Sequence, residues 1–226
     1  MPRRCVCCGR HLLLQERDIC VCCRADLPET HFARLRDNSM SEAFNSLIQR
    51  ESGSRFIAFG YATALFYYRG AYREISKSLK YHRGFSVGKA FSRQLAGRIV
   101  SSPLYSDVDA VVPVPLHWTR AWSRGYNQAR IIAREIAFAL GVPLQSGLLC
   151  RRRLTRSQTT LDSGGRAANT RGAFAVKRRC KTGFRHILLV DDVYTTGATT
   201  LACEQALHDN FPACRVSVAT LAFVEH

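Results

Sequence analysis

Short apolar runs alternate along this chain with segments whose apolar residues recur at helical spacing. Runs without polar alternation predict strands covered on both faces, as in a parallel sheet. Two such runs are residues 187–190 and 108–113, and the second ends at a proline pair. Further strands are expected at residues 56–68, at 144–149 and around Val216 and Val218.

Helical spacing is clearest over residues 129–140, where Gly141 is expected to end the helix. Tyr72, Ile75 and Leu79 predict a second helix, and residues 88–100 and 41–50 predict two more. Leu201, Ala202 and Ala206 give the buried face of a last helix. Strands that alternate with helices predict an α/β protein with a mostly parallel sheet and flanking helices.

The chain has 226 residues, enough for one α/β domain and a small appendage. We expect a cysteine-rich unit at 1–30, a linker with a short helix at 31–55, and the main domain at 56–226. The longest apolar run, 56–68, is too short to span a bilayer. The basic N-terminus has no apolar segment typical of a secretory signal, so a cytoplasmic protein without membrane insertion is expected.

The formal net charge of +16 is unevenly distributed. Residues 151–185 contain eleven Lys or Arg and a single acid, Asp162, which leaves a surplus of ten. This local excess favours a polyanionic partner, either a pyrophosphate or a nucleic acid. The alternative is a generally basic surface that keeps the protein soluble.

Six of the ten cysteines lie within residues 5–23. Two Cys-x-x-Cys pairs separated by eleven residues supply four thiolates for one structural zinc ion, from Cys5, Cys8, Cys20 and Cys23. Redox chemistry is the alternative, but one such pair would suffice for it. Cys7 and Cys22 each adjoin a proposed ligand, and their role is open. The remaining four are interpreted as structural: Cys150, Cys180, Cys203 and Cys214.

The segment HILLVDDVYTTGATT, residues 186–200, organises the chain. It reads as a buried strand, a tight loop and a helix start. The loop consists of Thr195, Thr196, Gly197, Ala198 and Thr199. Its glycine, hydroxyls and free helical N–H groups suit a phosphate.

Asp191 and Asp192 would repel that phosphate, so they are predicted to serve ribose hydroxyls or Mg²⁺. A ligand with a 5-phosphate, a diol and a Mg²⁺-bound pyrophosphate is phosphoribosyl pyrophosphate (PRPP). VDDVYTTGATT resembles the PRPP-binding signature of type I phosphoribosyltransferases. The alternatives are an ordinary strand, turn and helix with surface acids, or another phosphate loop, although the Walker pattern is absent.

Other segments are expected to complete the pocket. Val114 and Pro115 leave a strand at its carboxyl end, where open α/β sheets bind ligands. Arg120 and Arg124 precede a helix and suit a pyrophosphate, and Lys80 either reaches that anion or caps its own helix. Residues 151–172 are expected to form a lid, with a short helix near Arg166. Its candidate contacts are Arg151, Arg153, Thr155, Gln158 and Arg166.

PVPLHWTRAWSRGYNQA, LTRSQTTLDSGGRAANTRGAF and LLVDDVYTTGATT, together with the N-terminal cysteines, resemble the ComF/GntX family of bacterial phosphoribosyltransferase-like proteins over essentially the whole chain. The resemblance implies a type I phosphoribosyltransferase fold, a structural zinc ion and a role in natural competence or the use of imported DNA. It does not settle the acceptor base.

Three functions follow as hypotheses. The leading one is a Mg²⁺-dependent transferase that moves phosphoribose from PRPP to a nucleobase-like nitrogen acceptor, although no residue is identified as the general base. The second is a PRPP-sensing protein that binds single-stranded DNA or a competence partner, with Trp118, Trp122 and Tyr126 available for stacking. The third is a zinc-stabilised scaffold with a degenerate pocket.

Overall fold

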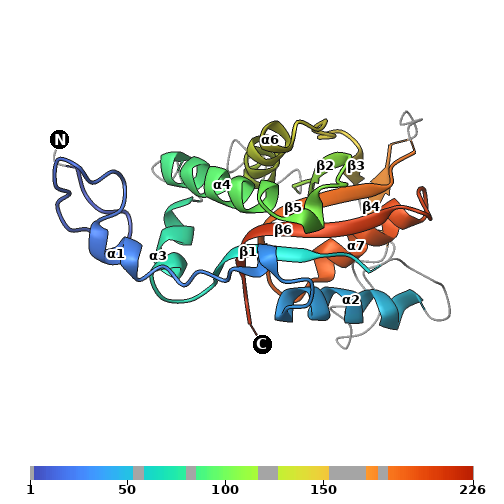
Figure 1. Cartoon of the computed structure of the whole chain (residues 1–226), viewed down its shortest axis with the longest axis horizontal. Helices are drawn as coiled ribbons and strands as arrows, with labels where there is room; N and C mark the ends of the chain where they lie inside the picture. The colour runs from blue at the N-terminus through green and yellow to red at the C-terminus, as the bar shows by residue number, and fades with distance from the viewer. Residues whose placement is uncertain are drawn as a thin grey trace.

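A four-stranded parallel sheet forms the centre of the molecule (Figure 1). The computed structural model describes residues 3–52, 59–79, 85–116, 127–152, 172–177 and 183–225. The strands of this sheet lie in the order β1-β6-β5-β2, and each neighbouring pair is parallel. Their bounds are β1 Ala62–Tyr67, β2 Ala110–Pro113, β5 His186–Tyr194 and β6 Arg215–Phe223.

The central strand β5 is apolar on both faces because helices cover both. Leu188 and Val190 pack in a cluster with residues of α4 and α6, whereas Ile187 and Leu189 pack with residues of α7. A strand that alternates between two covered faces has no polar side, which explains its uninterrupted apolar run. The predicted fold class, a mostly parallel sheet with flanking helices, is confirmed.

The other predicted helices are present, whereas the short helix expected near Arg166 lies outside the described residues. Their bounds are α2 Ser39–Ser52, α3 Gly70–Leu79, α4 Phe85–Val100, α6 Gln128–Leu140 and α7 Ala198–His208. Two short 3-10 helices, η1 Phe32–Arg34 and η3 Pro103–Tyr105, lie between them. Helix α6 ends at Gly141, whose φ of 69° lets its N–H bond back to the helix carbonyls.

The expected strand at residues 144–149 is wrong. Leu144 forms only an isolated parallel bridge to Val111, and a turn containing Gly147 follows. The chain then enters a separate two-stranded antiparallel sheet, β3 Leu149–Arg151 with β4 Phe174–Val176. Gln145, Ser146 and Gly147 interrupt the apolar run, and such residues favour a turn over a strand.

The N-terminal segment forms a small cysteine-rich unit, here called the knuckle (residues 3–26), which ends in helix α1 Val21–Ala25. The chain then runs beside β1, where the N–H of Tyr67 donates to the Pro28 carbonyl at 2.7 Å. Helix α2 follows and packs Met40, Phe44 and Ile48 under the sheet. Among the described residues no helix has both the length and the apolar character that a bilayer crossing requires.

Candidate functional site

The carboxyl ends of β2 and β5 meet at one edge of the sheet. Ala110 to Pro113 pair with Ile187 to Val190, and the N–H of Val114 donates to the Val190 carbonyl at 2.8 Å. The turn that leaves β2 therefore lies beside Asp191, the next residue along β5. In open α/β sheets this edge is where ligands bind.

The acid pair lies inside the last third of β5, since this strand continues to Tyr194. Asp191 is paired with Thr220 of β6, and both acidic residues are half-buried. The backbone N–H of Asp192 donates to the Asp191 carboxylate at 2.9 Å. Sheet pairing thus fixes the backbone that carries both carboxylates.

Burial and a neighbouring charge both act on Asp191. Burial raises the pKa of the Asp191 carboxyl well above its ordinary value, and the charge of Asp192 raises it further. The negative charge of Asp191 also contributes to the raised pKa of Cys203 on α7. That of Asp192 contributes to the raised pKa of Tyr72 on α3. For both Cys203 and Tyr72, burial is the larger cause of the raised pKa. The acid pair therefore influences the pKa of side chains on two different helices.

A bound cation would relieve this repulsion. Carboxylate oxygens at a strand end, beside a loop that suits phosphate, form the hard-oxygen donor set that Mg²⁺ prefers when it also binds substrate phosphates. The residues present thus fit a magnesium ion, with Asp191 and Asp192 as the protein ligands, directly or through water.

The loop after β5 leads into the N-terminus of α7. Gly197 is the N-cap residue with a φ of 75°, and no side chain caps the helix there. Thr195, Thr196 and Thr199 are exposed, whereas Ala198 is half-buried. Hydroxyls and the first N–H groups of an eleven-residue helix consequently lie together at the same edge as the acids.

Neighbouring side chains also limit the space around Gly197. A Cβ atom at this position would lie 2.3 Å from the Tyr194 hydroxyl oxygen and 2.6 Å from Leu47 Cδ1. Thr200 donates its hydroxyl to the Gly197 carbonyl at 2.8 Å, which closes the turn. Burial raises the pKa of Tyr194 to about 12, with a small opposing contribution from Thr200. Helix α2 and Tyr194 therefore support the loop, a role that the sequence analysis missed.

The side of the site predicted for pyrophosphate is described in part. Val114 is buried and Pro115 is half-buried. The Asn127 side-chain amide donates to the Val114 carbonyl at 3.1 Å, which ties the N-terminus of α6 to the end of β2. The other residues predicted here or as stacking partners lie outside the described residues: Lys80, Trp118, Arg120, Trp122, Arg124 and Tyr126.

The predicted lid also lies largely outside the described residues. Arg151 is exposed at the end of β3, and its guanidinium carbon lies 5.4 Å from the centre of the Phe174 ring. The other candidates of this segment fall outside: Arg153, Thr155, Gln158 and Arg166.

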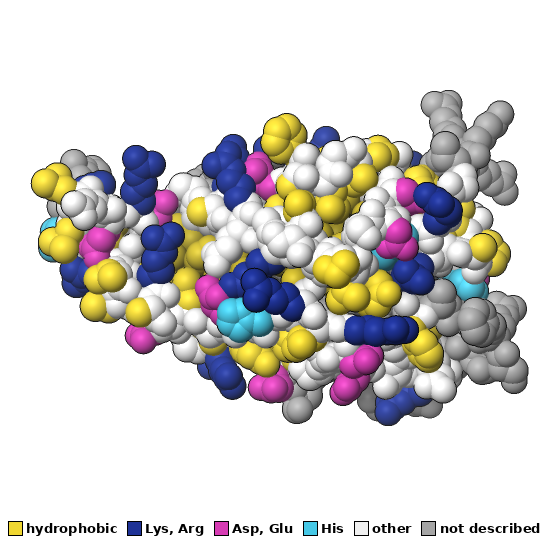
Figure 2. All heavy atoms as spheres, viewed as in Figure 1, with side chains coloured by type: hydrophobic (Ala, Val, Ile, Leu, Met, Phe, Trp, Pro, Cys, Tyr) yellow, Lys and Arg dark blue, Asp and Glu magenta, His cyan; other side chains and the backbone are white. Residues whose placement is uncertain are grey.

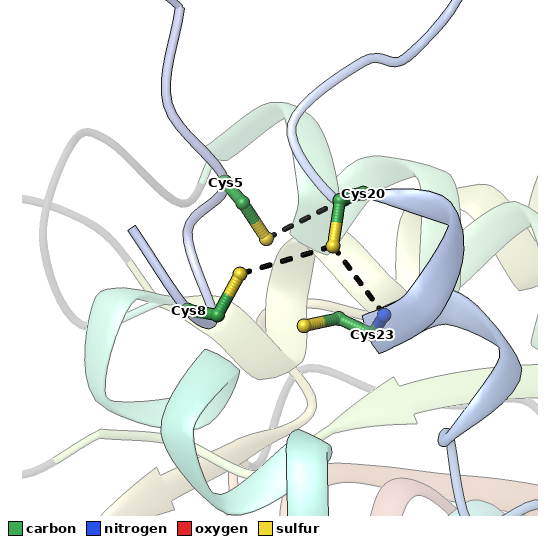
Figure 3. Close-up of side chains that lie close together, drawn as sticks. All are labelled: Cys5, Cys8, Cys20 and Cys23. Atoms are coloured by element: carbon green, nitrogen blue, oxygen red, sulfur yellow. Dashed lines mark hydrogen bonds between the residues drawn. The ribbon is translucent and has the colours of Figure 1, made fainter. Parts of the chain in front are cut away.

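The knuckle gathers four thiols (Figure 3). The sulfur atoms of Cys5, Cys8, Cys20 and Cys23 all lie within 4.8 Å of one another. The sulfur atoms of Cys8 and Cys20 are 3.8 Å apart. Tetrahedral zinc with Zn–S bonds of about 2.3 Å requires sulfur atoms about 3.8 Å apart, whereas a disulfide requires about 2 Å. The four thiols therefore fit a structural zinc ion.

Backbone donors prepare this cluster for thiolates. The N–H of Cys23 points at the Cys20 sulfur at 3.4 Å and is the largest of the causes that lower the pKa of Cys20 to about 6. The N–H of Cys20 similarly points at Cys5, also at 3.4 Å, and the pKa of Cys5 is lowered although burial opposes it. Zinc binds cysteine as thiolate, so these donors favour the binding form.

Comparison with known proteins bears on the resemblance to the ComF proteins. Competence protein F of Haemophilus influenzae is 36% identical over 92 residues, which cover 40% of each chain. The DNA utilization protein YhgH of Escherichia coli is 31% identical over 135 residues, 58% of this chain and 59% of that protein. Competence protein ComFC of Bacillus subtilis is 26% identical over 226 residues, 93% of this chain and 86% of that one. The chain is therefore similar in sequence to competence proteins of the ComF type.

The resemblance found in the motifs is thereby confirmed. The matched segments span 40% and 59% of the Haemophilus and Escherichia proteins, respectively. No protein-family model matches the chain. Among solved structures, an adenine phosphoribosyltransferase of Leishmania tarentolae covers 88% of the chain, with a TM-score of 0.39 and 14% identity.

Proposed function

We propose that this protein is a Mg²⁺-dependent type I phosphoribosyltransferase that uses PRPP and a nucleobase-like nitrogen acceptor. One observation carries the proposal. Asp191 and Asp192 lie in the last third of the inner strand β5, and the loop with the positive-φ Gly197 follows that strand directly, at the start of α7. Carboxylates for a ribose diol and a loop for its 5-phosphate match the two ends of one phosphoribosyl group.

The reaction exchanges one bond at the ribose C1 atom. The C1–O bond to pyrophosphate breaks, a C1–N bond forms, and the acceptor nitrogen loses a proton. Positive charge develops on the ribose ring while negative charge develops on the leaving group. Stabilising both charges is mainly an electrostatic task.

Each part of the site has a role in this reaction. Asp191 and Asp192 hold the ribose hydroxyls and face the positive ring. Thr195 to Thr199 hold the 5-phosphate through N–H groups and hydroxyls, and Val114 and Pro115 shape the pyrophosphate side. Mg²⁺, when bound, supplies neutralisation of the pyrophosphate. The lid contacts and the basic residues proposed from the sequence, Arg120, Arg124 and Lys80, would complete the charge balance.

Release of pyrophosphate tests the proposal. The protein is incubated with PRPP, Mg²⁺ and a panel of purine and pyrimidine bases, and released pyrophosphate is measured for each. The proposal requires release that depends on one class of base and on Mg²⁺. Release at the buffer rate with every base would reject it.

The names of the relatives suggest a role in natural competence and the use of DNA, which we extend to this protein. These names also favour a second candidate, a PRPP sensor that binds single-stranded DNA. The net charge of +16 favours the same candidate. Figure 2 shows Lys and Arg side chains spread over one face and interspersed with acidic and apolar ones. DNA affinity that falls steeply with salt and is unaffected by PRPP would favour this candidate.

A further inference from the structure

The knuckle contains the sequence Cys-Val-Cys-Cys twice, at residues 5–8 and 20–23. In each copy the first and last cysteines belong to the four-thiol cluster, and the middle one, Cys7 or Cys22, does not. Because the two copies are identical in sequence, any difference between Cys7 and Cys22 comes from what surrounds them. This pair is therefore a matched comparison within one chain.

The two copies differ in how far their side chains are buried. Val6 and Cys7 are half-buried and pack against the main core cluster. Val21 is 63% exposed, and Cys22 is exposed. The first copy is thus an internal contact of the molecule, and the second lies on its surface.

Cys7 contacts helix α3 on one side. Its thiol donates to the Ala71 carbonyl, with sulfur and oxygen 3.7 Å apart. Ala71 lies in the first turn of α3. Ile19, which directly precedes Cys20, packs against the same core cluster. Residues that pack on the core and on α3 are therefore neighbours in sequence of the thiols that would bind metal.

On its other side, Cys7 adjoins the metal-binding cluster itself. Its side chain packs against the buried cluster of Cys5, Cys20 and Cys23. A residue that packs on the proposed ligands and also donates to a helix carbonyl connects the two. The Cys22 thiol, in contrast, is exposed and makes no hydrogen bond within the described part of the chain.

Helix α3 begins at the same end of the sheet as the acid pair, because it directly follows β1 and this strand is parallel to β6 and β5. Tyr72 follows Ala71, is fully buried, and packs its ring 5.0 Å from that of Phe66 on β1. Burial raises the pKa of Tyr72, and the charge of Asp192 raises it further. The first turn of α3 therefore lies at the carboxyl end of the sheet and contacts the knuckle through Cys7.

We propose that Cys7 is a positioning residue through which the metal-loaded knuckle holds the first turn of α3 in place at the carboxyl end of the sheet. Bound metal fixes the backbone between Cys5 and Cys8, and so fixes the thiol that contacts Ala71. Loss of the metal frees this segment and loosens the helix. Only the effect on PRPP affinity rests on the proposed function; the coupling between metal and helix does not.

Amide hydrogen exchange of residues 70–79 tests the coupling in the full-length protein. The variants are Cys7→Ala, Cys7→Ser and, as the matched control, Cys22→Ala. Zinc content is measured for each. All three are expected to keep the zinc content of the wild type, because neither cysteine is a ligand. Exchange in α3 is expected to rise roughly fivefold in Cys7→Ala, the effect of one lost hydrogen bond. Cys7→Ser keeps a donor and recovers most of the protection, while Cys22→Ala matches the wild type.

A chelator provides the second arm and needs no substitution. Stripping zinc from the wild type is expected to raise exchange in α3 and to weaken binding of Mg²⁺-PRPP several-fold. The inference is overturned if α3 exchange is unchanged by the chelator, or if Cys7→Ala and Cys22→Ala exchange alike. Loss of zinc in Cys7→Ala also overturns it, since Cys7 would then be a ligand. A wild type that binds no PRPP rejects the proposed function and leaves the exchange result to decide the coupling.

Discussion

Substitution of Gly197 by alanine tests how the loop at the start of α7 is built. Two costs add at this position. A φ of 75° is unfavourable for a residue with a Cβ atom, by about 1 to 2 kcal/mol. In addition, the new methyl group would lie 2.3 Å from the Tyr194 hydroxyl oxygen. Tyr194 is 2% exposed and its ring is packed in the core, so it cannot easily move away, and such overpacking costs about 1 to 3 kcal/mol.

Gly141 separates the two costs. Its φ is 69°, but a Cβ atom there would meet nothing within 4 Å. Gly141→Ala therefore bears only the conformational cost of about 1 to 2 kcal/mol. Urea unfolding should show Gly197→Ala less stable than Gly141→Ala by about 1 to 3 kcal/mol.

Tyr194→Phe identifies the source of the clash, because it removes only the hydroxyl. Gly197→Ala should destabilise the Tyr194→Phe background less than it destabilises the wild type. The recovery is expected to be partial, since the ring carbon next to the hydroxyl and Leu47 Cδ1 also lie within 3 Å of the new atom. Equal stability of Gly197→Ala and Gly141→Ala, or no recovery in the Tyr194→Phe background, would refute this account of the loop.

Three further predictions concern stability and metal. Asp191→Asn should raise the urea midpoint at neutral pH, because a carboxyl whose pKa is raised by folding destabilises the protein as pH rises above the unfolded pKa of about 4; an unchanged or lower midpoint contradicts this. Burial lowers the pKa of His186, against the opposing effects of Asp107 and Asp109 and in the same direction as Arg215, so stability should fall as pH drops below about 6.5. His186→Gln should remove that slope, measured by urea unfolding between about pH 5 and 8; the same slope in both proteins would show that another group titrates. Cys8→Ser should abolish stoichiometric zinc while Cys22→Ser retains it, as measured by elemental analysis; full zinc in Cys8→Ser would exclude the proposed ligand set.

The sequence predicted the parts of this fold that depend on local patterns. Strand β5 was recognisable because both of its faces are covered, so its apolar run is continuous. The Cys-x-x-Cys spacing located four thiols that do come together. The acids and the glycine loop adjoin each other in sequence, so their proximity needed no knowledge of the fold.

Features set by distant contacts escaped prediction. Leu47 approaches Gly197 from a helix some 150 residues earlier. The sequence of neither segment predicts this contact. Asp107, His186 and Ser217 are joined by hydrogen bonds of 2.6 and 2.7 Å at the opposite edge of the sheet, yet they lie far apart in the chain. Strand β4 has only three residues and follows a basic segment, so it offers no period to detect. Cys7 and Cys22 have identical neighbours in sequence, and only the contact of Cys7 with α3 distinguishes them.

The binding isotherm of PRPP, recorded with and without Mg²⁺ for the wild type and for Asp192→Asn, tests the central claim most directly. The account predicts saturable binding by the wild type only with Mg²⁺, and loss of that binding in a variant that keeps its circular dichroism spectrum. Absence of binding by the wild type, or equal binding by a folded Asp192→Asn, would contradict the assignment of this edge of the sheet to an activated ribose.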